Sequence, residues 1–160
     1  MKGTGPVDFH LGCDFFRDET GTLCIGPKTY IERLGDQCET LFGEKPNAKY
    51  QSPLDKNDHP ELDTSKLLDD DGISRHQSLI GALQWAITLG RFDIAVAVMT
   101  MSAFRVAPQE GHIERLKRVV GCITKFKHVC IRICTGMPDH SDLPVGDELR
   151  LDTRHPWEGH

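Results

Sequence analysis

The spacing of apolar residues changes along this chain, and that change constrains its fold more than any other feature. In residues 7–16 every second residue is apolar, which predicts a strand with one buried face. The polar segment 17–22 predicts a turn, and 22–26 predicts the return strand of a hairpin. After Pro27 the apolar residues take helical spacing as far as Gly43, which offers a helix stop. Strands and helices in separate blocks predict an α+β fold.

A long segment of different character, residues 44–72, follows this opening hairpin and helix. Its three prolines lie among Lys, Asn, Asp and Gln residues, which predicts a strap with little core of its own. The strap ends in the acidic triplet Asp69-Asp70-Asp71. We interpret the triplet as solvated charge with an N-cap for the next helix, in preference to a metal site.

A three-helix bundle with a terminal strand is predicted after the strap. The helices are expected over about 73–89, from Asp93 to before Pro108, and from about Pro108 onward. The alternating segment 128–134 predicts the strand, and the tail from Thr135, which lacks periodicity, is expected to be disordered. The expected organisation is a hairpin and first helix (1–43), the strap (44–72), the helical region with its strand (73–135) and the tail (136–160).

Composition and motifs exclude several classes of protein. No run of apolar residues reaches the roughly 18 that a membrane helix needs. Residues 1–10 lack the apolar segment of a signal peptide, so we expect a cytoplasmic or nuclear protein rather than a secreted one. No Walker loop, GxSxG, HExxH or dinucleotide-binding fingerprint occurs. The residues alone therefore indicate no catalytic site and no cofactor.

The six cysteines include no CxxC pair, so a disulfide framework is not expected. Cys122, Cys130 and Cys134 lie close enough in sequence to raise a zinc or redox protein as one hypothesis. However, Cys130 and Cys134 would lie about 13 Å apart on one face of a strand, too far to share one ion. No metal ligands are therefore assigned.

A basic segment interrupts an otherwise acidic chain of net charge −5. Residues 115–138 hold six basic residues and no acidic one, whereas residues 1–114 hold 11 basic and 18 acidic residues. An unbroken basic stretch can neutralise phosphates, and the resulting affinity falls with salt. An ordinary solvated helix face is the alternative. The candidate phosphate-binding residues are Arg115, Lys117, Arg118, Lys125, Lys127 and Arg132.

Gly12 interrupts the alternating strand near the start of the chain. With no side chain at this position, the backbone of a ligand could lie against the strand. A β-bulge or a local twist without any ligand is the alternative. The residues alone leave both explanations open.

Five blocks of the sequence match, in order and spacing, a pattern known from one protein family. The blocks are MKGTGPVDFHLG (1–12), KTYIERL (28–34), HQSLIGALQWA (76–86), GRFDIAVAVMTMSAF (90–104) and GHIERLKRVVGCI (111–123). They resemble the later part of the reverse transcriptase domain of copia-type LTR retrotransposons, and the match covers about residues 1–135. Two positions depart from the family pattern, since His76 stands in place of a Tyr and Phe92 in place of a Pro.

The resemblance implies a role for the opening hairpin. In that family a Leu-Gly hairpin is the primer grip, which holds the 3′ end of the growing strand. Leu11 and Gly12 match it here, flanked by Phe9 and His10. The later helices would be thumb and connection, which hold an RNA–DNA or DNA template–primer by its phosphates. The basic residues within 115–132 fit that role.

The resemblance also implies what this chain lacks. The family's magnesium-binding polymerase carboxylates precede the hairpin, and its ribonuclease H domain follows the matched region. We therefore expect a fragment that acts with the missing palm, fingers and ribonuclease H portions, needs no cofactor of its own and does not polymerise alone. A small helical nucleic-acid-binding or scaffolding module is the alternative. A fragment of this kind is expected to expose an apolar face and to be poorly soluble.

Overall fold

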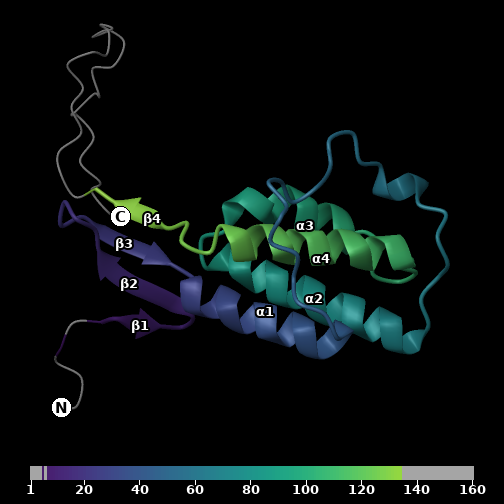
Figure 1. The fold of residues 1–160 in the computed structure, drawn as a ribbon, viewed down its shortest axis with the longest axis horizontal. Helices are drawn as coiled ribbons and strands as arrows, with labels where there is room; N and C mark the ends of the chain where they lie inside the picture. The colour runs from purple at the N-terminus through teal and green to yellow at the C-terminus, as the bar shows by residue number, and fades with distance from the viewer. Residues whose placement is uncertain (1–4, 6, 135–160) are drawn as a thin grey trace, which may run out of the picture.

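A four-stranded antiparallel sheet lies at one end of a bundle of four helices in the computed structural model, which describes residue 5 and residues 7–134 (Figure 1). The strands, in their order in the sheet, are β1 (Phe9–His10), β2 (Cys13–Arg17), β3 (Leu23–Gly26) and β4 (Ile131–Ile133). The helices are α1 (Lys28–Phe42), α2 (Asp70–Thr88), α3 (Ala95–Ser102) and α4 (Glu110–Lys125), with short 3-10 turns η1 (Pro60–Leu62) and η2 (Phe92–Ile94). The predicted α+β class is confirmed, and the predicted tail (136–160) lies outside the described residues.

The opening of the sheet differs from the prediction. The single strand expected over residues 7–16 is wrong, because a two-residue turn at Leu11-Gly12 divides it into β1 and β2. Both turn residues have positive φ, 51° and 94°, as the tight turns between antiparallel strands require. The alternation of apolar residues continues through the turn, so periodicity could not reveal it.

The remaining strands follow the predicted pattern. β2 and β3 form the expected hairpin, in whose turn the Asp18 carboxylate accepts hydrogen bonds from the amides of Thr20 and Thr22, at 2.9 and 3.0 Å. The expected final strand is shorter than 128–134, and it pairs with β3, so that Ile131 lies opposite Ile25. The sheet thus joins the two ends of the described chain.

The helices enclose one continuous apolar core. Its buried residues include Ile31, Leu34, Leu79, Ile80, Leu83, Ile94, Val98, Met101, Leu116, Val120 and Ile123. Most of them hold the positions whose helical spacing predicted the helices. The second helix of the predicted bundle is shorter than expected, since it consists of η2 followed by the eight-residue α3. None of the described helices combines the length and the apolar character that crossing a bilayer demands.

One polar side chain of α2, that of His76, lies inside this core. It is fully buried, and neither of its ring nitrogens has a hydrogen-bond partner. Burial lowers the pKa of the imidazole to about 4, helped by the positive charge of Arg105. A buried group without partners avoids charge, so His76 is neutral at pH 7.

The strap is residues 44–69, because α2 already begins at Asp70. The Asp69 carboxylate accepts a hydrogen bond from the Gly72 amide at 2.8 Å, which confirms the predicted N-cap. Within the strap only Pro60 is fully buried. Figure 1 shows the strap crossing α4 and then passing around the end of the bundle that lies away from the sheet.

Candidate nucleic-acid interface

The four predicted primer-binding residues, Phe9 to Gly12, lie together at the tip of the β1–β2 hairpin. Leu11 is 69% exposed and Phe9 is 45% exposed, while His10 is also exposed. The tip therefore presents two apolar side chains and an imidazole to solvent. Such a surface can pack against sugars and bases, and it is too small to hold a substrate by itself.

The structure explains the glycine at position 12 by packing within the protein rather than by the expected space for a ligand. A side chain at this position would meet Leu89 Cδ1 at 3.0 Å and the indole nitrogen of Trp85 at 3.5 Å. The missing side chain therefore lets the hairpin tip rest on the end of α2. The expectation of an open surface for a ligand backbone at Gly12 is wrong, because Leu89 fills that space. Primer binding by the exposed side of the tip remains a prediction.

The base of the hairpin is also fixed in place. The Asp14 carboxylate in β2 accepts hydrogen bonds from the amide and the hydroxyl of Thr29 in the first turn of α1, at 2.8 and 2.6 Å. The Arg33 guanidinium lies 5.7 Å from the centre of the Phe9 ring, within the range of a cation–π contact. Arg33 takes part in none of the ion pairs among the described residues. No local pattern of residues predicts this cation beside the tip.

The basic stretch is not an unneutralised surface. Among the described residues, five of its six members form ion pairs with acids from distant segments or the preceding turn. The pairs are Arg115 with Asp58 and Asp63, Lys117 with Glu44 and Glu114, Arg118 with Asp55, Lys127 with Glu32, and Arg132 with Asp18. Lys125 forms no such pair, and its ammonium lies 5.5 Å from the centre of the Phe126 ring. The premise of a free basic face is therefore wrong, whereas phosphate binding stays a prediction.

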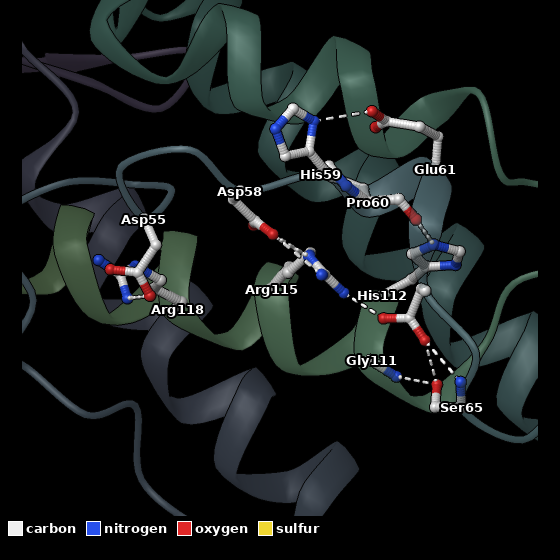
Figure 2. A network of polar contacts seen from close by, with 11 residues as sticks. Asp55, Asp58, His59, Pro60, Glu61, Ser65, Gly111, His112, Arg115 and Arg118 are labelled. Atoms are coloured by element: carbon white, nitrogen blue, oxygen red, sulfur yellow. Dashed lines mark hydrogen bonds and ion pairs between the residues drawn. The ribbon is translucent and has the colours of Figure 1, made fainter.

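Arg115 is the centre of the contacts between α4 and the strap, which Figure 2 shows. Its guanidinium donates to both oxygens of Asp58 at 2.9–3.0 Å and also to the carboxylate of Asp63. Hydrogen bonds from the Ser65 hydroxyl and amide, together with Arg115, lower the pKa of Asp63 to about 2. Asp63 is therefore ionised at pH 7 and paired with this arginine.

Hydrogen bonds between the strap and the start of α4 extend this network. The Gly111 amide donates to the Ser65 hydroxyl at 2.9 Å (Figure 2). His112 accepts a hydrogen bond from the Gln109 amide at Nδ1, so its Nε2 carries the proton and donates to the Pro60 carbonyl at 3.0 Å. These polar contacts hold this part of the strap against α4.

The other two basic residues on this part of α4 combine ion pairs with aromatic contacts. Arg118 donates to Asp55 at 2.6 Å and lies 4.6 Å from the centre of the Tyr50 ring. The Lys117 ammonium donates to Glu44 at 2.7 Å and to Glu114 at 2.8 Å. Partial burial opposes the charge of Lys117, but these two hydrogen bonds raise its pKa overall.

The cysteines of the zinc hypothesis do not meet. Cys122 is buried in α4, Cys130 is half-buried and Cys134 is exposed. Burial raises the pKa of the Cys122 thiol, which disfavours the thiolate that a metal or an oxidant needs. Within the described part of the chain, no group of three or more His, Cys, Asp or Glu side chains is placed to hold a metal ion.

Comparison with known proteins found one informative similarity. The chain is 28% identical over 137 residues to a protein of Saccharomyces cerevisiae (strain ATCC 204508 / S288c) described as "Putative transposon Ty5-1 protein". The match covers 85% of this chain and 42% of the yeast protein, so the chain spans less than half the length of that relative. No family model matches the chain, and no solved structure matches it significantly. The similarity supports a transposon-derived protein without identifying a reverse transcriptase domain.

Proposed function

We propose that this chain is part of a copia-type retrotransposon reverse transcriptase, an RNA-directed DNA polymerase, and that it positions the template–primer without carrying the catalytic carboxylates. Two features support the proposal. The five sequence blocks follow the family order, and a transposon protein is similar over 85% of the chain. The observation that carries the role in primer binding is the exposed, doubly anchored tip of the β1–β2 hairpin.

The tip suits contact with the end of a strand because it is both exposed and held in place. Leu11 and Phe9 offer apolar surface on which a terminal sugar or base can pack. His10 adds a hydrogen-bonding group, and Arg33 adds a positive charge beside Phe9. Contacts of the tip with Leu89, and of the hairpin base with α1, limit its movement. A grip that positions a primer terminus for reaction needs such preorganisation.

Catalysis in this proposal depends on the rest of the parent protein. The parent family uses magnesium, which would be held by carboxylates of the palm, and the template–primer would also contact fingers and the ribonuclease H portion. Two-metal phosphoryl transfer needs those carboxylates to bind both ions. We therefore propose that the chain alone binds template–primer without extending it.

Protection of a primer 3′ end tests this function. A recessed RNA–DNA template–primer is incubated with the chain, and 3′-exonuclease digestion of the primer is followed with time. Leu11→Asp should reduce the protection at least about tenfold, since a carboxylate at the tip repels the terminal phosphates. Val106→Asp is the matched control, because Val106 is 88% exposed and lies outside the hairpin. Equal protection by the two variants would refute a primer grip at this tip.

A small nucleic-acid-binding or scaffolding module is the second candidate function. The observation that favours it is the helical core, in which α1, α2, α3 and α4 pack around their own buried residues. Such a module would bind blunt and recessed duplexes alike. A part of a reverse transcriptase should instead prefer the recessed end, and Leu11→Asp should remove this preference. That result would distinguish it from the module.

A further inference from the structure

Three basic residues of α4 each contact acids of the strap. Arg115 contacts Asp58 and Asp63, Lys117 contacts Glu44, and Arg118 contacts Asp55. The strap thus places carboxylates where a basic nucleic-acid-binding face would receive phosphates. Guanidinium groups bind carboxylates and phosphates with the same fork of donors, so the two anions compete for such a face.

These contacts fall into two groups that differ in burial. The Asp58 and Asp63 side chains beside Arg115 are only 14% and 9% exposed. The Asp55 and Glu44 side chains, in contrast, are 72% and 63% exposed. Ion pairs with an exposed partner contribute little to stability and weaken with salt. The Arg115 contacts therefore form a fixed latch, while the other two pairs can exchange partners.

The strap segment that covers Arg118, residues 48–57, lies between two fixed points. On one side the strap crosses α4 at Gly121, where a side chain would lie 2.2 Å from the Asn47 carbonyl oxygen. On the other side lies the Arg115 latch. Between these two points no residue of the segment is fully buried. The Arg118 guanidinium donates to the Asp55 carboxylate at 2.6 Å and to the Ser52 carbonyl at 3.2 Å. The segment is thus fixed at its ends, and its middle is held by Arg118 and by Leu54, which packs half-buried against the core.

We propose that Lys117 and Arg118 form a second contact for nucleic-acid phosphates, which is masked in the free protein by Glu44 at Lys117 and by segment 48–57, through Asp55, at Arg118. A duplex offers one charge per about 1.7 Å of its axis, a denser array than Asp55 and Glu44 provide. Binding displaces the segment and leaves the Arg115 latch closed. That the bound nucleic acid is a template–primer rests on the proposed function. The masking of Lys117 and Arg118 by strap acids does not rest on it.

Removing the charges of Glu44 and Asp55 tests the proposal by its effect on duplex binding. The double variant Glu44→Gln, Asp55→Asn should bind an RNA–DNA duplex about tenfold more tightly, and its salt slope should steepen by about one or more, because Arg118 loses its carboxylate partner while Lys117 keeps only Glu114. Asp36→Asn with Asp70→Asn removes the same charge at two exposed positions that form no described ion pair. Equal tightening in both variants, or an unchanged slope, would overturn the mask.

Opening of the segment can be measured without any duplex. Trypsin cleaves after Lys56, which is exposed within segment 48–57. Long-chain inorganic polyphosphate should accelerate this cleavage several-fold over sodium chloride of equal ionic strength, and a small chromogenic substrate in the same tube corrects for effects on the protease. The double variant should already be cleaved at the faster rate. A rate that polyphosphate leaves unchanged refutes the mask even if the hairpin protects primer ends. Accelerated cleavage together with equal protection by Leu11→Asp and Val106→Asp refutes the proposed function alone.

Discussion

The buried imidazole of His76 makes the stability of this fold depend on pH in a calculable way. Its pKa is about 4 in the folded chain, against an ordinary 6.5 once the chain unfolds. The unfolded state therefore binds the extra proton, and stability is lost as the pH falls from 6.5 toward 4. Because one pKa unit corresponds to 1.36 kcal/mol, the complete loss is about 3 kcal/mol, and about 2 kcal/mol is already lost at pH 5.

Urea denaturation at pH 7.5 and pH 5.0 measures this loss. His76→Leu removes the titrating group and places an apolar side chain of similar size among the core residues. The free energy of unfolding of the wild-type chain should fall by about 2 kcal/mol more than that of His76→Leu between the two pH values. His128 is exposed, so His128→Gln should behave as the wild type does. Parallel losses in the wild type and in His76→Leu would show that His76 is not buried in its neutral form.

Two glycines give further predictions, each measured by urea denaturation at pH 7.5. Gly12→Ala should destabilise the fold by about 1–2 kcal/mol, because its φ of 94° disfavours a side chain and Leu89 lies 3.0 Å from the added carbon. Gly121→Ala should cost about 1–3 kcal/mol, since the added carbon meets the Asn47 carbonyl at 2.2 Å and pushes the strap away. Gly81→Ala is the control for both, because nothing lies within 4 Å of its added carbon in α2. Stability equal to that of the control would contradict the contact assigned to either glycine.

Local patterns in the sequence determined most of the elements of this protein. Helical spacing located α1, α2 and α4 because each buries one continuous face, and the acidic triplet 69–71 indicated an N-cap, although α2 begins three residues before the expected residue 73. The β2–β3 hairpin followed from polar turn residues between alternating strands. These signals are readable in a short window because the interactions behind them span only a few residues.

Only the tertiary structure decided how the candidate site is arranged. The turn at Leu11-Gly12 packs against Leu89, which lies far along the chain, whereas the alternation of apolar and polar residues continues through the turn. The cations of α4 looked free in the sequence because, apart from Glu114, their acids lie 52 to 73 residues away, in the strap. Charge pairing depends on distance in space, which no count of neighbouring residues contains. The sequence therefore determined which groups exist, and packing determined which of them remain available to a ligand.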